Sequence, residues 1–272
     1  MSELTLIGGV PGEGGLRQDV VLRPMTGRTE MALVDLGDAA SNLSQPARVN
    51  RFLAETVESV GGAPVDPGAL SVGDRQYLVR QIGARLGPDT VWLGGTCQAC
   101  DGPFEVPVTQ SDLPVKPAGP GYPQTRLSVE GTACVLRSPT GADQEAIAGL
   151  PPGAAADALF ALLVEQVETG ALGVEAKQQL EAAIEDLSPE VALEVATSCP
   201  ECGAALRIEI DPYLALSRPS SDILDEIHLI ASQYHWSEAE ILALPRARRQ
   251  AYLARIDRAR GMVRAPEFGA EG

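Results

Sequence analysis

The chain has 272 residues, of which 44% are hydrophobic and only 4% aromatic, and its formal net charge at pH 7 is −16. A chain of this length can bury a substantial core in one composite domain or two smaller ones. The acidic charge argues against nucleic acid and anionic membrane surfaces as general partners. The sequence also lacks a long apolar run and a basic leader, so we expect a soluble, cytoplasmic protein without direct membrane insertion.

The first part of the chain is predicted to have a flexible segment followed by a mostly helical region. Residues 1–16 are rich in glycine, which favours a flexible N-terminus, and the helical region covers residues 17–89. Apolar side chains at helical spacing predict one helix over 44–60, stopped by the glycine pair that follows it. A second helix is predicted to begin at a cap on Ser71, with Asp74 at capping-box spacing, and to end at the next Gly-Pro pair.

Residues 90–113 contain the first half of a metal site. Cys97 and Cys100 form a C-x-x-C pair, with Gly102 close behind and strand-like residues on both sides. In such a pair one tight turn presents two sulfurs to the same ion, and the nearby glycine is expected to supply the left-handed backbone of the turn. Two thiolates hold a metal poorly, so this half needs a second pair elsewhere in the chain.

Residues 114–188 are predicted to form an inserted subdomain of one hairpin and several helices. A Pro- and Gly-rich stretch opens it, and a hairpin follows over 125–137 with its turn at a Glu-Gly pair. Thr140 is expected to cap a short helix, and two longer helices are predicted at about 154–168 and 174–186.

Residues 189–212 repeat the strand–knuckle–strand pattern with a second C-x-x-C pair. Two such knuckles complete the tetrahedral four-thiolate shell that zinc prefers in structural sites. The 98 residues between the pairs, 101–198, are tolerated because the cost of loop closure rises only logarithmically with length. The sequence therefore predicts one structural Zn²⁺ per chain in a zinc ribbon, with the ligands Cys97, Cys100, Cys199 and Cys202.

Other chemical interpretations of the cysteines fit less well. A catalytic zinc needs an open coordination position and a nearby general base, whereas four thiolates close the shell. Either pair alone could be a redox dithiol, but the βαβ context typical of such dithiols is absent. Cys134 lies among apolar neighbours and is predicted to be a buried thiol rather than a fifth ligand. We therefore predict no catalytic residue, no small-molecule substrate and no enzymatic activity.

The C-terminal region, residues 213–261, is predicted to be helical, and 262–272 to be a flexible tail. Ser237 and Glu240 make a capping box, which starts a new helix after a first one has ended near Tyr234.

Residues 246–260 carry six arginines, and three interpretations of them stay open. They could form a solvated face that pairs with the chain's own acidic surface, or a docking surface for carboxylates of a neighbouring subunit. Nucleic acid is the third interpretation, which the overall charge opposes. The predicted docking residues are Arg246, Arg248, Arg249, Tyr252 and Arg255.

Three segments, "PTGADQEA", "SCPECG" and "YHWSEAEILALPRARRQAYL", resemble in this order the baseplate proteins of contractile-tail bacteriophages of the T-even type. Homologues of these proteins occur in phage-derived contractile injection systems. The resemblance extends over about residues 17–257. It departs from the family at "CQACDG", where a proline more often follows the first cysteine, and in the Gly-rich start. It implies a structural component or assembly factor of a baseplate in a phage-tail-like particle, with other baseplate or tail subunits as partners.

The predicted fold class is α+β, mainly helical, with a central four-cysteine zinc ribbon whose two knuckles are separated by an inserted hairpin-and-helix subdomain. The predicted function is a baseplate component or assembly factor with zinc as a structural element. The alternative is a zinc-ribbon adaptor associated with nucleic acid or transcription.

Overall fold

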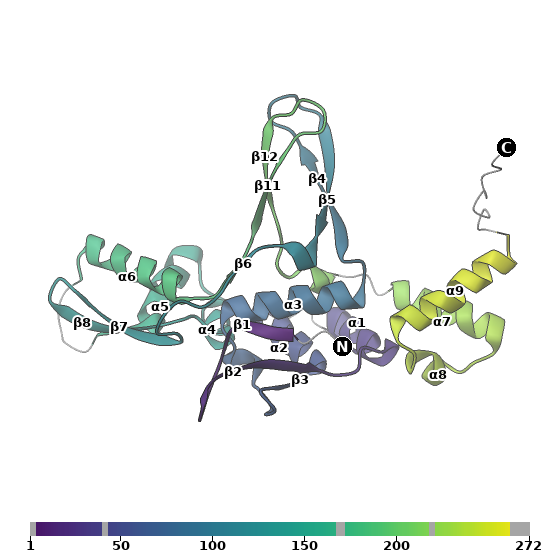
Figure 1. The fold of residues 1–272 in the computed structure, drawn as a ribbon, viewed down its shortest axis with the longest axis horizontal. Helices are drawn as coiled ribbons and strands as arrows, with labels where there is room; N and C mark the ends of the chain where they lie inside the picture. Colours follow the sequence, from purple (N-terminus) through teal and green to yellow (C-terminus); the bar gives the residue numbers. More distant parts are fainter. Residues whose placement is uncertain (1–3, 40–42, 167–171, 218–220, 262–272) are drawn as a thin grey trace, which may run out of the picture.

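The computed structural model describes residues 4–39, 43–166, 172–217 and 221–261. They form a central body from which three parts project: an arm, a lobe and a C-terminal helical unit (Figure 1). The lobe and the C-terminal unit lie at opposite ends of the long axis, and the arm rises between them. Strands occur in the body, the arm and the lobe, so the fold is a mixture of helix and strand and the description "mainly helical" does not fit it. The predicted tail, 262–272, lies outside the described residues.

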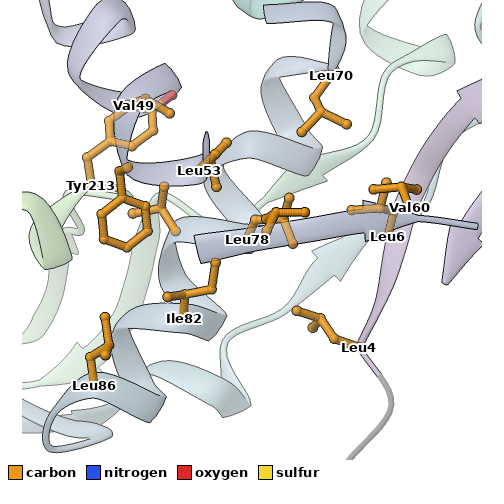
Figure 2. Packing of buried hydrophobic residues seen from close by; sticks show 13 residues of the cluster. Leu4, Leu6, Val49, Leu53, Val60, Leu70, Leu78, Ile82, Leu86 and Tyr213 are labelled. Atoms are coloured by element: carbon orange, nitrogen blue, oxygen red, sulfur yellow. The ribbon is translucent and has the colours of Figure 1, made fainter. Parts of the chain in front are cut away.

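The body packs a three-stranded antiparallel sheet, in the order β1-β2-β3, against three helices. Apolar side chains from the sheet, α2 and α3 gather in one buried cluster (Figure 2). The elements of the body are β1 (Leu4–Gly12), β2 (Gly15–Leu22), α1 (Gly27–Ala39), α2 (Gln45–Thr56), β3 (Val57–Val60) and α3 (Val72–Leu86).

The prediction of a flexible start is wrong for Leu4–Gly12, which form β1. Leu4 and Leu6 are buried in the core, and the backbone N–H groups of Gly8 and Gly9 each donate to the carboxylate of Asp74 at 2.9 Å. A Cβ atom at Gly8 would lie 2.8 Å from Asp74 Oδ2. Here glycine permits close packing of a strand on a helix, which a local sequence pattern does not reveal. Burial raises the pKa of Asp74 from its usual 3.8, and the hydrogen bonds from Gly9 and Gly8 oppose this rise.

The predicted helix over 44–60 ends earlier than expected. Its apolar residues are buried as predicted, but α2 stops at Thr56 and the chain continues as β3, which pairs with β2. The next predicted helix is confirmed as α3, with Ser71 accepting a hydrogen bond from the Asp74 backbone and Gly87 at the C-terminal cap.

The arm consists of two β-hairpins that come from distant parts of the chain. The strands are β4 (Thr90–Thr96) and β5 (Pro103–Thr109) in one hairpin, and β11 (Glu194–Ser198) and β12 (Ala205–Glu209) in the other. Below the arm, the short strands β6 (Val115–Lys116) and β10 (Glu190–Val191) pair antiparallel.

The lobe is the segment between those two short strands. It contains β7 (Gln124–Val129), β8 (Thr132–Arg137), α4 (Gly141–Ile147), α5 (Pro152–Leu163), β9 (Val164–Gln166) and α6 (Val174–Leu187). The hairpin β7–β8 is where the sequence predicts it, and β9 adds a third antiparallel strand that was not predicted. Leu136, Leu163 and Leu180 lie in the core of the lobe.

The C-terminal unit contains the helices α7 (Ser221–Tyr234), α8 (Glu238–Leu242) and α9 (Arg246–Ala259). The predicted capping box of Ser237 and Glu240 starts α8. Ile230, Ile241 and Ile256 form the core of the unit, to which Met31 and Val34 of α1 contribute, so α1 joins this unit to the body.

Candidate metal centre

The four predicted cysteine ligands meet at the tip of the arm. Cys97 and Cys100 lie in the turn between β4 and β5, and Cys199 and Cys202 lie in the turn between β11 and β12. Their four sulfur atoms all lie within 4.8 Å of one another. Figure 1 shows the ends of the two hairpins side by side at the tip of the arm, which is where the four thiols cluster.

The two cysteine turns have the same backbone geometry. In the first, the N–H of Cys97 donates to the carbonyl of Gly102 at 2.9 Å, and the N–H of Asp101 donates to the carbonyl of Cys97 at 2.8 Å. The second turn repeats both bonds, from Cys199 to Ala204 and from Gly203 to Cys199, at 2.8 and 2.9 Å.

The left-handed position in each turn is the residue directly after the second cysteine. It is Gly203 in the second turn, with φ of 74°, but Asp101 in the first, with φ of 55°. The expectation that Gly102 supplies the left-handed backbone is therefore wrong. A Cβ atom at Gly102 would lie 3.3 Å from Cys100 Sγ, so this glycine leaves room for the sulfur instead.

Two of the sulfur–sulfur distances match those of a tetrahedral four-thiolate site. The Cys97 and Cys202 sulfurs are 3.8 Å apart, and the Cys100 and Cys199 sulfurs are 3.9 Å apart. Bonds of about 2.3 Å from one zinc ion to four sulfurs place neighbouring sulfurs about 3.8 Å apart. A disulfide would need about 2.05 Å, so the cysteines are free thiols in an arrangement that suits a metal.

The thiols differ in exposure and in proton affinity. Cys97 and Cys199 are buried, whereas Cys100 and Cys202 are exposed. Backbone N–H groups of Ala99 and Cys100 lower the pKa of Cys97 to about 7. At Cys100 the N–H of Gly102 favours the thiolate, but the sulfur of Cys202, burial and the other two sulfurs raise the pKa to about 12. Four adjacent thiolates repel one another, and a divalent cation would relieve this repulsion.

Apolar packing in the arm is concentrated near its base. Val108, Leu113 and Ile210 are buried there, with Val91 and Val195 packed beside them. Nearer the tip, the hairpins contribute small or partly exposed residues such as the glycine pair of β4. Within both turns and the strand ends next to them, Cys97 and Cys199 are the fully buried residues, so the thiol cluster is the buried centre of the tip.

Cys134 lies away from this cluster. It is a residue of β8, is 1% exposed and belongs to the core of the lobe. The prediction that it is a buried thiol is confirmed.

Arg249, predicted to dock a partner, is fully buried within the chain. Its side chain donates to Glu226 at 2.8 Å, to Glu30 at 2.7 Å and to the carbonyl of Leu244 at 2.9 Å. Burial lowers the pKa of Arg249, and the hydrogen bonds from it to Glu30 and Glu226 more than offset this, so that the pKa is raised. The docking prediction is wrong for this residue, because its charge is already neutralised internally.

The other predicted docking residues divide into two groups. Arg246 is half-buried and donates to the carbonyl of Leu86 at 2.8 Å, and Tyr252 packs its ring against Trp236 with centroids 4.9 Å apart. Both therefore have structural contacts within the chain. Arg248 and Arg255 are exposed on α9. Glu30, which pairs with both Arg246 and Arg249, lies 219 residues from Arg249 in the sequence, so a local pattern does not reveal these contacts.

No protein-family model matches this chain, and neither does any curated protein or solved structure. None of the described helices is both long and apolar enough to cross a bilayer.

Proposed function

We propose that the four cysteines bind one structural zinc ion, and that the chain is a non-enzymatic component or assembly factor of the baseplate of a phage-like contractile injection system. One observation carries the zinc proposal: four thiol sulfurs from two hairpins lie within 4.8 Å of one another, at spacings that suit a tetrahedral ion. An all-thiolate, tetrahedral shell favours zinc over oxygen-preferring cations such as Mg²⁺ or Ca²⁺.

A structural role fits this ligand set better than a catalytic one. Four cysteine ligands leave no coordination position for water or substrate, which a catalytic zinc requires. A bound zinc would supply a cross-link between the hairpins, and the binding free energy of about 10–16 kcal/mol at such sites acts as folding free energy. The chain's own residues hold the sulfurs in position through the paired backbone hydrogen bonds of the two turns.

The baseplate proposal rests on the resemblance of three sequence segments, and their places in the fold agree with a structural role. "PTGADQEA" starts α4, "SCPECG" forms a cysteine turn, and "YHWSEAEILALPRARRQAYL" builds the end of α7, α8 and α9. These segments lie in separate parts of the molecule rather than around one cleft. Such a distribution suits a subunit with several contacts more than an enzyme.

A zinc-ribbon adaptor for nucleic acid is the second candidate. The observation that favours it is the set of exposed arginines on α9, since arginine binds phosphate through two parallel hydrogen bonds. The net charge of −16 opposes it.

The zinc proposal is tested by metal analysis of purified protein. We expect one zinc per chain in the wild type, a large loss in Cys199→Ser, and full retention in Cys134→Ser, which removes a thiol that is not a ligand. Unchanged zinc in Cys199→Ser, or equal loss in both variants, would contradict the four-ligand site.

The baseplate proposal is tested in cells that produce contractile particles and encode this chain. Deleting its gene should abolish intact particles, whether the chain stays in the particle or acts only during assembly, and Cys199→Ser should reproduce the defect. Normal particles after deletion would show that the function lies elsewhere, without bearing on zinc binding.

A further inference from the structure

The exposed face of α9 is a stripe of arginine and alanine. Arg248, Ala251, Arg255 and Arg258 are all exposed and are spaced at i, i+3, i+7 and i+10, which places them on one side of the helix. The opposite side carries the buried residues Arg249 and Ile256. The stripe spans ten residues, or about 15 Å along the helix axis.

The charges of this stripe are not neutralised within the part of the chain that the structure describes. There, the ion pairs of α9 join Arg246 and Arg249 to Glu30 and Glu226. Arg255 donates only to a carbonyl of its own helix. An otherwise strongly acidic chain thus presents a compact, unpaired basic surface at one end.

A stripe of the opposite charge lies on α6. Glu175, Gln178, Ala182 and Glu185 are exposed at the same spacing of i, i+3, i+7 and i+10. The other side of α6 is the buried side, which carries Ala176, Leu180, Ile184 and Leu187. The exposed residues Glu181 and Asp186 flank the stripe and add negative charge.

The two stripes match when the helices run antiparallel. Arg248 then faces Glu185, Arg258 faces Glu175, and Arg255 faces the amide of Gln178. Ala251 faces Ala182, and two small side chains at the centre allow the helices to approach closely. The guanidinium groups can pair with the carboxylates through two hydrogen bonds each, which lysine could not do.

These stripes cannot meet within one molecule, because α6 lies in the lobe and α9 in the C-terminal unit, at opposite ends of the long axis (Figure 1). We propose that α9 of one copy docks on α6 of a second copy, so that the chain self-associates head to tail. A single contact of this kind between each pair of molecules is heterologous and produces a ring or a filament, whereas two reciprocal contacts between antiparallel molecules close a two-fold dimer. This inference does not depend on zinc or on a baseplate.

The test is sedimentation velocity of the full-length, zinc-replete chain at several concentrations. At about 50 mM salt the wild type should form species larger than a monomer that grow with concentration, and about 500 mM salt should dissociate them, because salt screens exposed charges. The variant Arg248→Glu/Arg258→Glu should raise the dissociation constant by at least about 100-fold, since like charges then face each other. The variant Glu175→Arg/Glu185→Arg should do the same.

Mixing these two variants gives the sharpest result. Each retains one intact stripe, and the reversed stripe of one variant carries the opposite charge to the reversed stripe of the other. An equimolar mixture should therefore associate again, although neither variant associates alone. Unfolded variants could not restore association in this way. The matched control, Arg51→Glu/Arg126→Glu, reverses two exposed arginines on other elements and should associate like the wild type.

Three outcomes would overturn the proposal: a wild type that stays monomeric at low salt, charge variants that associate like the wild type, or variants that fail to complement each other. A monomeric wild type that binds short double-stranded DNA, with binding lost in Arg248→Glu/Arg258→Glu, would assign the stripe to nucleic acid instead.

Discussion

Adjacent arginines on α9 have opposite surroundings, which only the folded chain determines. Arg249 is fully buried between two carboxylates, whereas Arg248 is exposed. In sequence the two are equivalent members of one basic cluster. The cysteine cluster, in contrast, was predictable because the spacing within each pair is local and specific, and the structure brings both pairs together.

The buried position of Arg249 leads to a stability prediction. Arg249→Met leaves Glu226 without its cation and Glu30 with only the longer contact of 3.6 Å to Arg246, and it should lower the free energy of unfolding by about 3–5 kcal/mol. Arg248→Met should change it by less than about 0.5 kcal/mol. Chemical denaturation of the two variants measures both values.

A further variant distinguishes lost charge pairing from lost packing. Adding Glu30→Gln and Glu226→Gln to Arg249→Met removes the stranded charges and should recover part of the lost stability. If the triple variant is less stable than Arg249→Met alone, the carboxylates are not the cause of the effect.

At the scale of elements, helix starts were predictable and two helix ends were not. Ser71 and Ser237 cap helices as the local motifs indicate, and Thr140 forms a capping box with Asp143. Helix caps can be predicted from the sequence because the residues that form a cap are close together in the chain.

The two missed helix ends have the same cause. In both places the predicted helix changes to a strand at a valine, which is Val57 at the start of β3 after α2 and Val164 at the start of β9 after α5. These strands form because β2 and β8 offer pairing edges, and both partners lie at least fifteen residues away in sequence. A β-branched residue such as valine favours a strand over a helix, but the periodicity of apolar residues does not show at which residue the helix ends and the strand begins.

The helix start at α4 leads to a prediction about pH. The carboxylate of Asp143 accepts two hydrogen bonds from Arg137, both 2.6 Å, and one from the N–H of Thr140 at 2.8 Å. Burial raises the pKa of Asp143, but the hydrogen bonds from Arg137 and Thr140 prevail, so the pKa is lowered from its usual 3.8. The resulting stabilisation is present above the unfolded pKa and is lost as pH falls through the lowered folded value.

Arg137→Gln should therefore cost about 1 kcal/mol at neutral pH, allowing for the partial exposure of Arg137. The difference from the wild type should shrink as the pH falls from about 5 to about 2. Urea unfolding of both chains across this range measures the difference, in which acid-induced changes that the two chains share cancel. Arg126→Gln, on the exposed face of β7, is the control and should show no such trend. A difference that stays constant with pH would contradict the role of Asp143.

At the scale of the whole molecule, the arrangement of parts was only partly predictable. The sequence predicts two knuckles separated by an inserted segment, and the structure shows two hairpins with a lobe between them along the chain. The sequence does not predict that the lobe and the C-terminal unit lie at opposite ends of the molecule. The position of the C-terminal unit depends on α1, which lies near the start of the chain and supplies part of that unit's core. That contact depends on shape complementarity between residues far apart in sequence.

Because the two cysteine pairs are far apart in the sequence, a ribosome synthesises the first pair well before the second. Cys97 and Cys202, whose sulfurs are in contact, are 105 residues apart in the sequence, and Cys100 and Cys199 are 99 residues apart. At about 5–20 residues per second, the second pair leaves the ribosome roughly 5–20 s after the first. During that interval the first turn offers a metal only two ligands. The complete cluster of four thiols therefore exists only in chains whose lobe has already been synthesised, and a truncated chain that lacks the second turn has only two of the four.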